Sequence, residues 1–257
     1  MSTLVSGIVN VLAPISLGDL DAIAALQVRN DRKYVVDETT VDLMLGELAD
    51  GLQILQIDGL RTFNYRSVYF DTSNFDLHHA AASGRRRRFK VRTRIYEDSA
   101  QVMLEVKTKD GRGRTVKERL DYDLDNSSQL TPEGRRFVQV VLASSDVPVT
   151  DEVLNEMGLH AVLTTAYRRS TIVHETSGTR ATIDRALVCS ATDGRSTSLD
   201  AVIVESKSPK AAGPVDRWMW AHGHRPLKIS KYSTGLAALH PELPSNKWRR
   251  TLNRHFS

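Results

Sequence analysis

The sequence of 257 residues contains a single cysteine, Cys189, which excludes an internal disulfide and fits a reducing compartment. No apolar run approaches the roughly 20 residues that a membrane-spanning helix needs. The opening residues lack the basic region of a signal peptide. Repeats of fixed period and Gly/Ser-rich or Pro-rich linkers are also missing. We therefore expect a cytoplasmic protein without a membrane segment.

Two kinds of functional motif are missing from the sequence. The sequence has no G-x-x-x-x-G-K-[ST] loop, which excludes a P-loop enzyme. It has no recognisable motif for reading nucleic acid, and aromatic residues make up only 6% of it. His78 and His79 have no metal-ligand spacing with the other histidines, and Cys189 has no neighbouring base that would activate its thiol.

Arginine is the abundant residue. Of the 35 basic residues, 25 are Arg and 10 are Lys, against 31 Asp and Glu, for a net charge of +4. The planar guanidinium suits phosphate and carboxylate oxygens. Composition alone leaves nucleic acid, a phosphorylated metabolite and an ordinary solvated surface open. The Arg-rich, Lys-poor usage suggests a bacterial source with a GC-rich genome.

Segments of alternating polarity dominate the middle of the chain and predict an antiparallel, barrel-like sheet. The expected strands cover residues 62–71, 87–96, 101–108, 114–124, 162–173, 179–188 and 199–207, with a hairpin turn at Asp110-Gly111. Helices are expected over residues 17–26, 37–48, 132–142, 214–222 and 233–239, and one is expected to start at Ser73.

Charges gather on one face of each expected strand, because residues of the same parity share a face. In residues 89–96, Lys90, Arg92 and Arg94 lie opposite an apolar face. A solvated sheet face would also alternate in this way. However, each segment is biased to basic residues, with only an occasional carboxylate such as Glu105 or Glu205. If these faces line a lumen, polyanions or a metal must neutralise it.

Eight segments in order carry a resemblance to a known family. They are RNDRKY (29–34), FKVRTRIY (89–96), LEVKTK (104–109), TVKER (115–119), YRRST (167–171), RATID (180–184), VESK (204–207) and KISKY (228–232). Together they resemble the VTC domain, the polyphosphate polymerase domain of the vacuolar transporter chaperone complex. That domain belongs to the triphosphate tunnel metalloenzyme superfamily.

The resemblance implies an α+β fold that is mainly antiparallel β, with a closed eight-stranded β-tunnel flanked by helices. It places the tunnel domain at residues 27–240, after an N-terminal lead-in at 1–26 that is helical in part. A basic C-terminal helix or tail follows at residues 241–257. The catalytic residues that it implies are Lys33, Arg92, Arg94, Lys107, Arg169 and Arg180. The substrate-binding residues that it implies are Arg29, Lys90, Lys117, Arg119, Lys228, Ser230 and Lys231.

The same resemblance implies a divalent cation, Mn²⁺ or Mg²⁺, held by Glu205 and, as a second ligand, Glu105. One departure concerns the first strand, where Asp31-Arg32-Lys33 stands in place of the usual E-x-K pattern. Aspartate is one methylene shorter than glutamate, so Asp31 is in doubt as a ligand. It then pairs with Arg29 or another arginine of the tunnel.

The leading expectation is a metal-dependent phosphotransferase, a polyphosphate polymerase that passes the γ-phosphoryl group of ATP to a growing polyphosphate chain. The alternatives are a tunnel triphosphatase, with Glu105 orienting a water, and a binding module that captures polyphosphate or nucleotides without turnover. The expected partners are ATP and inorganic polyphosphate rather than nucleic acid. A membrane partner and the oligomeric state are left open by the sequence.

Overall fold

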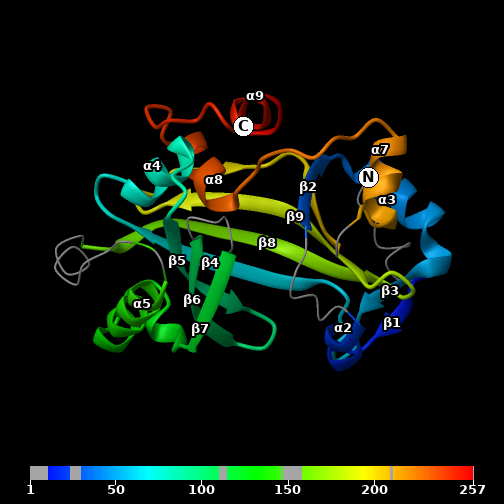
Figure 1. The fold of residues 1–257 in the computed structure, drawn as a ribbon, viewed down its shortest axis with the longest axis horizontal. Coiled ribbons are helices and arrows are strands. Elements are labelled where there is room, and N and C mark those ends of the chain that lie inside the picture. Colours follow the sequence, from blue (N-terminus) through cyan, green and yellow to red (C-terminus); the bar gives the residue numbers. More distant parts are fainter. Residues whose placement is uncertain are drawn as a thin grey trace.

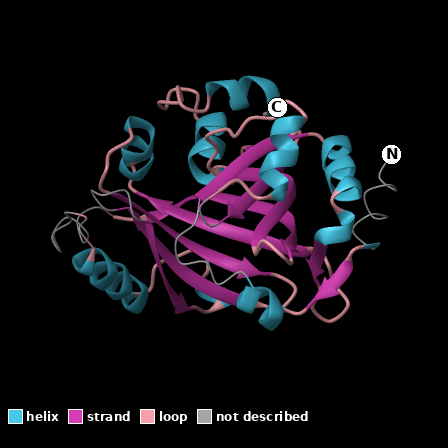
Figure 2. Ribbon diagram, turned by 45° about the vertical axis from the view of Figure 1, so that its right-hand side comes forward, coloured by secondary structure: helices cyan, strands magenta, loops and turns pink. Residues whose placement is uncertain are grey.

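The expected sheet is present in the computed structural model, which describes residues 11–23, 30–109, 115–145, 147, 158–208 and 211–256. Eight strands are hydrogen-bonded in the order β2-β11-β9-β8-β4-β5-β6-β7, and all neighbours on this path are antiparallel. Their bounds are β2 Asn30–Val36, β11 Val202–Ser208, β9 Thr179–Ala191, β8 His160–His174, β4 Phe63–Asp71, β5 Arg88–Tyr96, β6 Gln101–Lys109 and β7 Thr115–Asp121. The strands form one curved sheet with helices around it (Figure 2).

Three short strands extend this sheet. The strand β1 (Ala13–Ile15) pairs in parallel with β3 (Leu52–Leu55), which also pairs with β8. The strand β10 (Ser196–Ser198) pairs with β9. The described residues also form seven α-helices, whose positions Figure 1 shows. They are α2 Leu17–Ile23, α3 Glu38–Glu47, α4 Asp76–Ser83, α5 Pro132–Ser144, α7 Pro214–Ala221, α8 Lys231–Leu239 and α9 Arg249–His255.

Short polar residues fix the starts of three helices. The side chain of Asp37 accepts a hydrogen bond from the backbone N–H of Thr40 at 2.7 Å and caps α3. Thr131 caps α5 in the same way, and the proline that follows it has no N–H to leave unsatisfied. Ser230 caps α8 by accepting from the backbone of Ser233. These caps fix the residue at which each helix begins.

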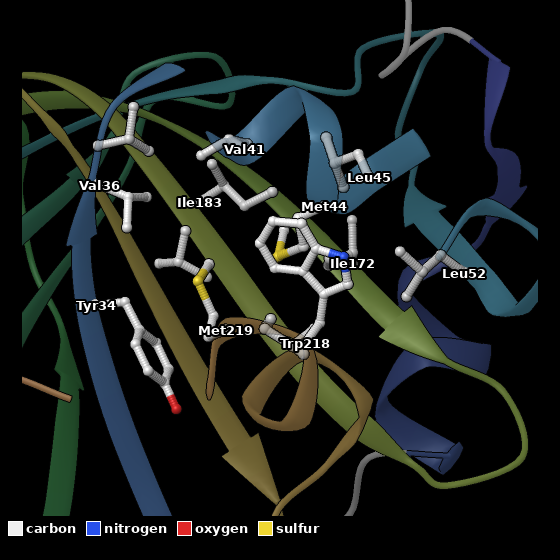
Figure 3. Packing of buried hydrophobic residues seen from close by; sticks show 14 of the residues in the cluster. Tyr34, Val36, Val41, Met44, Leu45, Leu52, Ile172, Ile183, Trp218 and Met219 are labelled. Atoms are coloured by element: carbon white, nitrogen blue, oxygen red, sulfur yellow. The ribbon is translucent and has the colours of Figure 1, made fainter. Parts of the chain in front are cut away.

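The helices α3 and α7 cover the outer face of β2, β11, β9 and β8. Met44 and Leu45 of α3 and Trp218 of α7 pack on Tyr34 and Ile183 of the sheet (Figure 3). Full burial of such side chains stabilises the fold by about 1.5–3 kcal/mol each. This packing orients β2 and β11 so that their other faces turn inward.

The helix α5 covers the other half of the outer face. Val138 and Leu142 pack there on Val91, Leu104 and Val106 of β5 and β6. In Figure 1, α5 lies at the opposite end of the molecule from α3 and α7. The apolar residues of β5 and β6 therefore face outward, and the alternating charged residues face inward.

The helix α8 packs on the inner face instead. Tyr232 and Leu236 join Tyr69, Leu163 and Cys189 in one buried cluster. Tyr69 pairs with Arg92 across β4 and β5, so it shares the face of the charged residues. The first turn of α8 therefore lies beside the inner surface of the sheet.

The expected fold class is confirmed, since the fold is α+β and mainly antiparallel β with eight strands on the main path. The sheet differs from the expected closed tunnel, because no hydrogen bonds join β2 to β7 among the residues described. The expected helix at Ser73 starts at Asp76, after a turn. The hairpin turn at Asp110-Gly111 lies outside the described residues, as do residues 1–10 of the lead-in and residues 24–26 at the end of its expected helix. The domain boundaries stay predictions.

Candidate functional site

The inward faces of the curved sheet carry the predicted charged residues, and the region that these faces line is called the lumen here. Glu105 is the centre of one charged cluster in it. In register, Glu105 of β6 lies between Arg92 of β5 and Arg119 of β7. Arg92 Nε donates to Glu105 Oε2 at 2.8 Å. Arg119 Nε lies 3.3 Å and Lys117 Nζ 3.6 Å from Oε1. Burial would raise the pKa of Glu105, but the surrounding cations, led by Arg92, outweigh it and lower the pKa to about 2.

A row of three lysines crosses the same strands without a carboxylate. Lys90 lies opposite Lys107, and Lys107 lies opposite Lys117. Lys90 Nζ donates to Ser230 Oγ at 2.8 Å, at the start of α8. Burial and the charge of Lys33 lower the pKa of Lys90 to about 7, and the same two causes lower the pKa of Lys107. Lys33 belongs to β2, so β2 faces β5 and β6 across the lumen.

The opposite wall carries Glu205. It lies between Lys33 of β2 and Thr182 of β9 in register. Glu205 Oε2 is 3.6 Å from Lys33 Nζ, and Oε1 is 3.8 Å from Lys207 Nζ. Burial would raise the pKa of Glu205, but the charges of Lys33 and Lys207 outweigh it and hold the pKa well below its ordinary value. Glu205 is therefore a carboxylate at neutral pH.

Asp184 of β9 is the third carboxylate of the lumen, and it is fully buried. Arg169 of β8 donates to it through Nε at 2.6 Å and Nη2 at 2.8 Å, a bidentate pair. Lys231, the first residue of α8, donates to Asp184 Oδ2, the oxygen that also accepts from Arg169 Nη2. Burial would raise the pKa of Asp184, but Arg169 and Lys231 outweigh it and hold the pKa far below its ordinary value. The contact between Lys231 and Asp184 ties α8 to the sheet.

Tyrosines hold the guanidinium groups beside this pair. The rings of Tyr65 and Tyr167 stack with centroids 5.4 Å apart. Arg169 lies 5.3 Å from both rings, and Arg94 lies 5.5 Å from Tyr65. Arg94 Nη2 also donates to Tyr167 Oη at 3.0 Å. Such cation–π contacts limit the motion of the arginines and so preorganise their donors.

Several buried polar atoms at lumen positions have no hydrogen-bond partner among the described residues. They are Arg94 Nε, Arg180 Nε, Thr182 Oγ1, Ser67 Oγ and Thr165 Oγ1. Ser67 lies opposite both Arg94 and Thr165 in register. A buried donor without a partner is costly, so these groups fit a ligand that accepts hydrogen bonds.

Lys228 is exposed. Burial and the charges of Arg88, Lys228 and Lys109 lower the pKa of Lys247, so these four basic residues lie near one another. Arg180 forms an ion pair at 3.2 Å with Asp21 of α2. The structure thus brings predicted residues of seven strands, and Ser230 and Lys231 at the start of α8, to one inner face. Arg29 lies outside the described residues.

The strand parity places Asp184 on the face of Arg180 and Tyr167 on the face of Arg169, but sequence reasoning assigned neither of them a role. It missed Ser67, Thr165 and Tyr65. These three residues carried no comparable signal, since uncharged residues of these types occur on many strands.

A divalent cation, which the resemblance implies, can be tested against these carboxylates. Among the described residues, no group of three or more His, Cys, Asp or Glu could hold a metal by itself. Glu105 and Asp184 are bound directly by arginines, whereas the cations beside Glu205 lie beyond hydrogen-bond distance. This donor set fits Mg²⁺ or a similar ion held by one carboxylate, with phosphate oxygens and water as its other ligands.

Comparisons with known proteins identify one family model and several solved structures that align with this chain. A model of the VTC domain matches residues 28–240. Among solved structures, the PH1819 protein from Pyrococcus horikoshii aligns at 13% identity over 83% of this chain and 98% of that chain, with a TM-score of 0.46. The HpAC1 protein from Hippeastrum, described as having a dominant triphosphatase activity, aligns at 15% identity over 79% and 93%, with a TM-score of 0.44.

A third structure, the Pct1 RNA triphosphatase of S. pombe, aligns at 10% identity over 100% of this chain and 95% of that chain, with a TM-score of 0.29. The comparison with curated proteins gives no match. In the part of the chain that the structure describes, the helices are too short or too polar to cross a membrane.

Proposed function

This chain belongs to the VTC domain family, and on that premise we propose that it is a polyphosphate polymerase that uses ATP. Family membership and the basic lumen support binding of a polyphosphate or triphosphate inside the tunnel. The finer proposal is that the γ-phosphoryl group of ATP passes to the end of a polyphosphate chain. A terminal oxygen of the chain attacks the γ-phosphorus, the bond to the β–γ bridging oxygen breaks, and ADP leaves.

The observation that carries this proposal is the uneven charge of the lumen. Lys90, Lys107 and Lys117 lie side by side across three strands, and the nearest carboxylate among their own three strands is Glu105, 3.6 Å from Lys117 Nζ at the end of the row. Like charges placed directly opposite are destabilising in a sheet. A row of this kind favours a ligand with a repeating negative charge, as in a linear polyphosphate. The lysines thus support the acceptor chain, and the arginines support the triphosphate.

The arginines are suited to stabilise the transfer itself. In phosphoryl transfer the negative charge spreads over the equatorial oxygens of the transferred group. Arg92 and Arg169 are each fixed by a carboxylate, while Arg94 keeps its Nε without a partner among the described residues. Donors that are held in place beforehand need no reorganisation during the reaction. Arg92 and Arg94, with Arg169 and Arg180, therefore bind the triphosphate of ATP.

Glu205 would hold the divalent cation, which supplies charge neutralisation on the phosphate oxygens when bound. Lys33 would orient the Glu205 carboxylate from the neighbouring strand β2. Lys207 would do so from β11, the strand that carries Glu205 itself. Glu105 serves as the counter-charge that positions Arg92 and Arg119 rather than as a base, because a carboxyl group with a pKa of about 2 is a weak proton acceptor.

The test is a product assay with purified protein, ATP, Mn²⁺ or Mg²⁺, and pyrophosphate as primer. Long-chain polyphosphate is scored on gels, and released phosphate is measured in parallel. The variant Arg94→Ala should lower the rate of chain growth by about 100-fold, since it removes a preorganised donor. Arg168→Ala is the matched control, because Arg168 is exposed and lies next to Arg169 on the opposite face of β8. Its rate should stay within about twofold.

Each product pattern has a definite meaning. Chain growth that Arg94→Ala loses and Arg168→Ala keeps supports a polymerase that works in the lumen. Phosphate release without chains would replace the proposal with a triphosphatase. Tight binding of polyphosphate without either product would replace it with a binding module.

A further inference from the structure

A second basic concavity lies outside the lumen, at the free edge of β2. It is a pocket of about 230 Å³ between β2, the segment after α7 and the helix α9. Its basic side chains are Arg225, Arg250, Arg254, His224 and His255, and Val35 and Leu227 contribute apolar surface. None of the charged residues of the lumen lines it. The pocket is therefore a separate feature of the surface.

The arginines of this pocket are not neutralised within the described part of the chain. No side-chain hydrogen bond or ion pair joins Arg225, Arg250 or Arg254 to another described residue. Among the carboxylates nearby, Asp37 lies close to His224 and Asp200 close to His255. The guanidinium donors of the three arginines are therefore available to a ligand.

The helix that carries two of these arginines is firmly anchored. Trp248, just before α9, is buried and contacts the ring of His78. After the helix, Phe256 forms a bridge with Leu199, and the backbone N–H of Asp200 donates to the carbonyl of His255 at 2.8 Å. Arg250 and Arg254 are four residues apart, so they project from the same face of α9. The backbone that carries these two arginines is therefore held in place.

We propose that this pocket is a binding site for a small phosphate-bearing anion. Arginine forks from two elements match the oxygens of a phosphate group. The volume is below the 300–1,000 Å³ that is typical of drug-sized ligands, which favours orthophosphate, pyrophosphate or the phosphate of a phosphomonoester over a whole nucleotide triphosphate. Arg250, Arg254 and His255 lie beyond the residues that match the family model. The other lining residues, including His224 and Arg225, lie within the matched residues, so the pocket is formed between the matched domain and the segment that follows it.

The segment from 223 to 231 connects this pocket to the lumen. His224, Arg225 and Leu227 line the pocket, and Ser230 and Lys231 contact Lys90 and Asp184 in the lumen. The backbone N–H of Leu227 donates to the carbonyl of Lys33 at 2.7 Å, on the strand that carries a predicted catalytic lysine. An anion bound in the pocket is therefore held by the same segment that ends at the start of α8.

The experiment is isothermal titration calorimetry of the full chain at low salt, without a divalent metal. The probes are orthophosphate, pyrophosphate and the phosphomonoester AMP, each titrated separately. Wild type should show a site that the double variant Arg250→Ala/Arg254→Ala weakens at least tenfold. Arg225→Ala, from a different element, should weaken the same site. Binding of tripolyphosphate in the lumen should be unchanged in both variants.

Arg249→Ala is the matched control, because Arg249 is on α9 but does not line the pocket. It removes the same charge and should leave the site intact. The proposal is overturned if none of the three probes shows a site sensitive to the pocket variants, or if Arg249→Ala weakens binding equally. Binding of all three probes identifies the phosphate group as sufficient, whereas binding of AMP alone identifies a phosphomonoester. Arg250→Gln/Arg254→Gln repeats the test if the alanine variant fails to fold.

Discussion

Lys90 should take up a proton when a polyanion enters the lumen. In the empty protein its pKa is about 7, because burial and the neighbouring lysines disfavour the ammonium form. At pH 8 a group with this pKa is charged in roughly one molecule in ten, whereas a lysine with its ordinary pKa is charged in nearly all. A bound polyanion favours the charged form. Binding should therefore draw roughly 0.9 proton onto Lys90 at pH 8.

The assay is calorimetric titration of tripolyphosphate at pH 8, without metal, in two buffers of different ionisation enthalpy. The difference in observed heat gives the number of protons taken up. Lys90→Arg keeps the positive charge and removes the titration, so its uptake should fall by roughly 0.9 proton. Lys117, whose pKa burial and neighbouring arginines lower to about 8, provides a graded comparison. Lys117→Arg should lower the uptake by roughly half a proton.

The ligand's own change in protonation is the same with each protein, so it cancels when the proton uptake of wild type and variant is compared. Equal uptake by wild type and Lys90→Arg would refute the reasoning. The sign for stability follows from the same shift. Between pH 7 and about 10 the unfolded chain binds more protons at Lys90 than the folded, empty protein does, so this group makes stability rise with pH over that window. Affinity for polyanions should fall over the same window.

Three further predictions concern single side chains. Glu205→Gln should abolish metal-dependent activity while tripolyphosphate binding without metal becomes tighter, because a carboxylate leaves the lumen; unchanged activity would contradict the assigned ligand. Asp184→Asn should destabilise the fold by about 3–5 kcal/mol, since its two cationic partners stay buried, as urea unfolding would measure. Gly235→Ala should cost about 1–3 kcal/mol, because its Cβ would lie 2.5 Å from Cys189 Sγ. Adding Cys189→Ala should recover part of that loss in thermal unfolding, and no recovery would contradict the contact.

The strands that carry the lumen could be predicted from the sequence because alternation is a local property. The parity of residues 89–96 places Lys90, Arg92 and Arg94 on one face, and the structure has them there. The outward packing of α5 on β5 and β6 follows from the same alternation. Each of these inferences needs only residues that are close in the sequence.

Partners from distant strands could not be predicted in this way. Arg169 and Asp184 meet because β8 contains a register shift between Ala166 and Arg168, and no local pattern marks that irregularity. The lack of pairing between β2 and β7 in the described residues also depends on the curvature of the whole sheet. The pocket beside α9 depends on where the chain end docks, which Trp248 and Phe256 decide through tertiary packing.

The row of Lys90, Lys107 and Lys117 has a consequence for the life of the protein in a cell. Without an anion, these side chains repel one another, so the vacant form is the less stable one. A ligand that binds only the folded state adds a stabilisation that grows with the logarithm of its concentration. Unfolded molecules are the ones that proteases remove. The abundance of this protein should therefore follow the supply of its own polyanion, rising when that supply is plentiful and falling when it is exhausted.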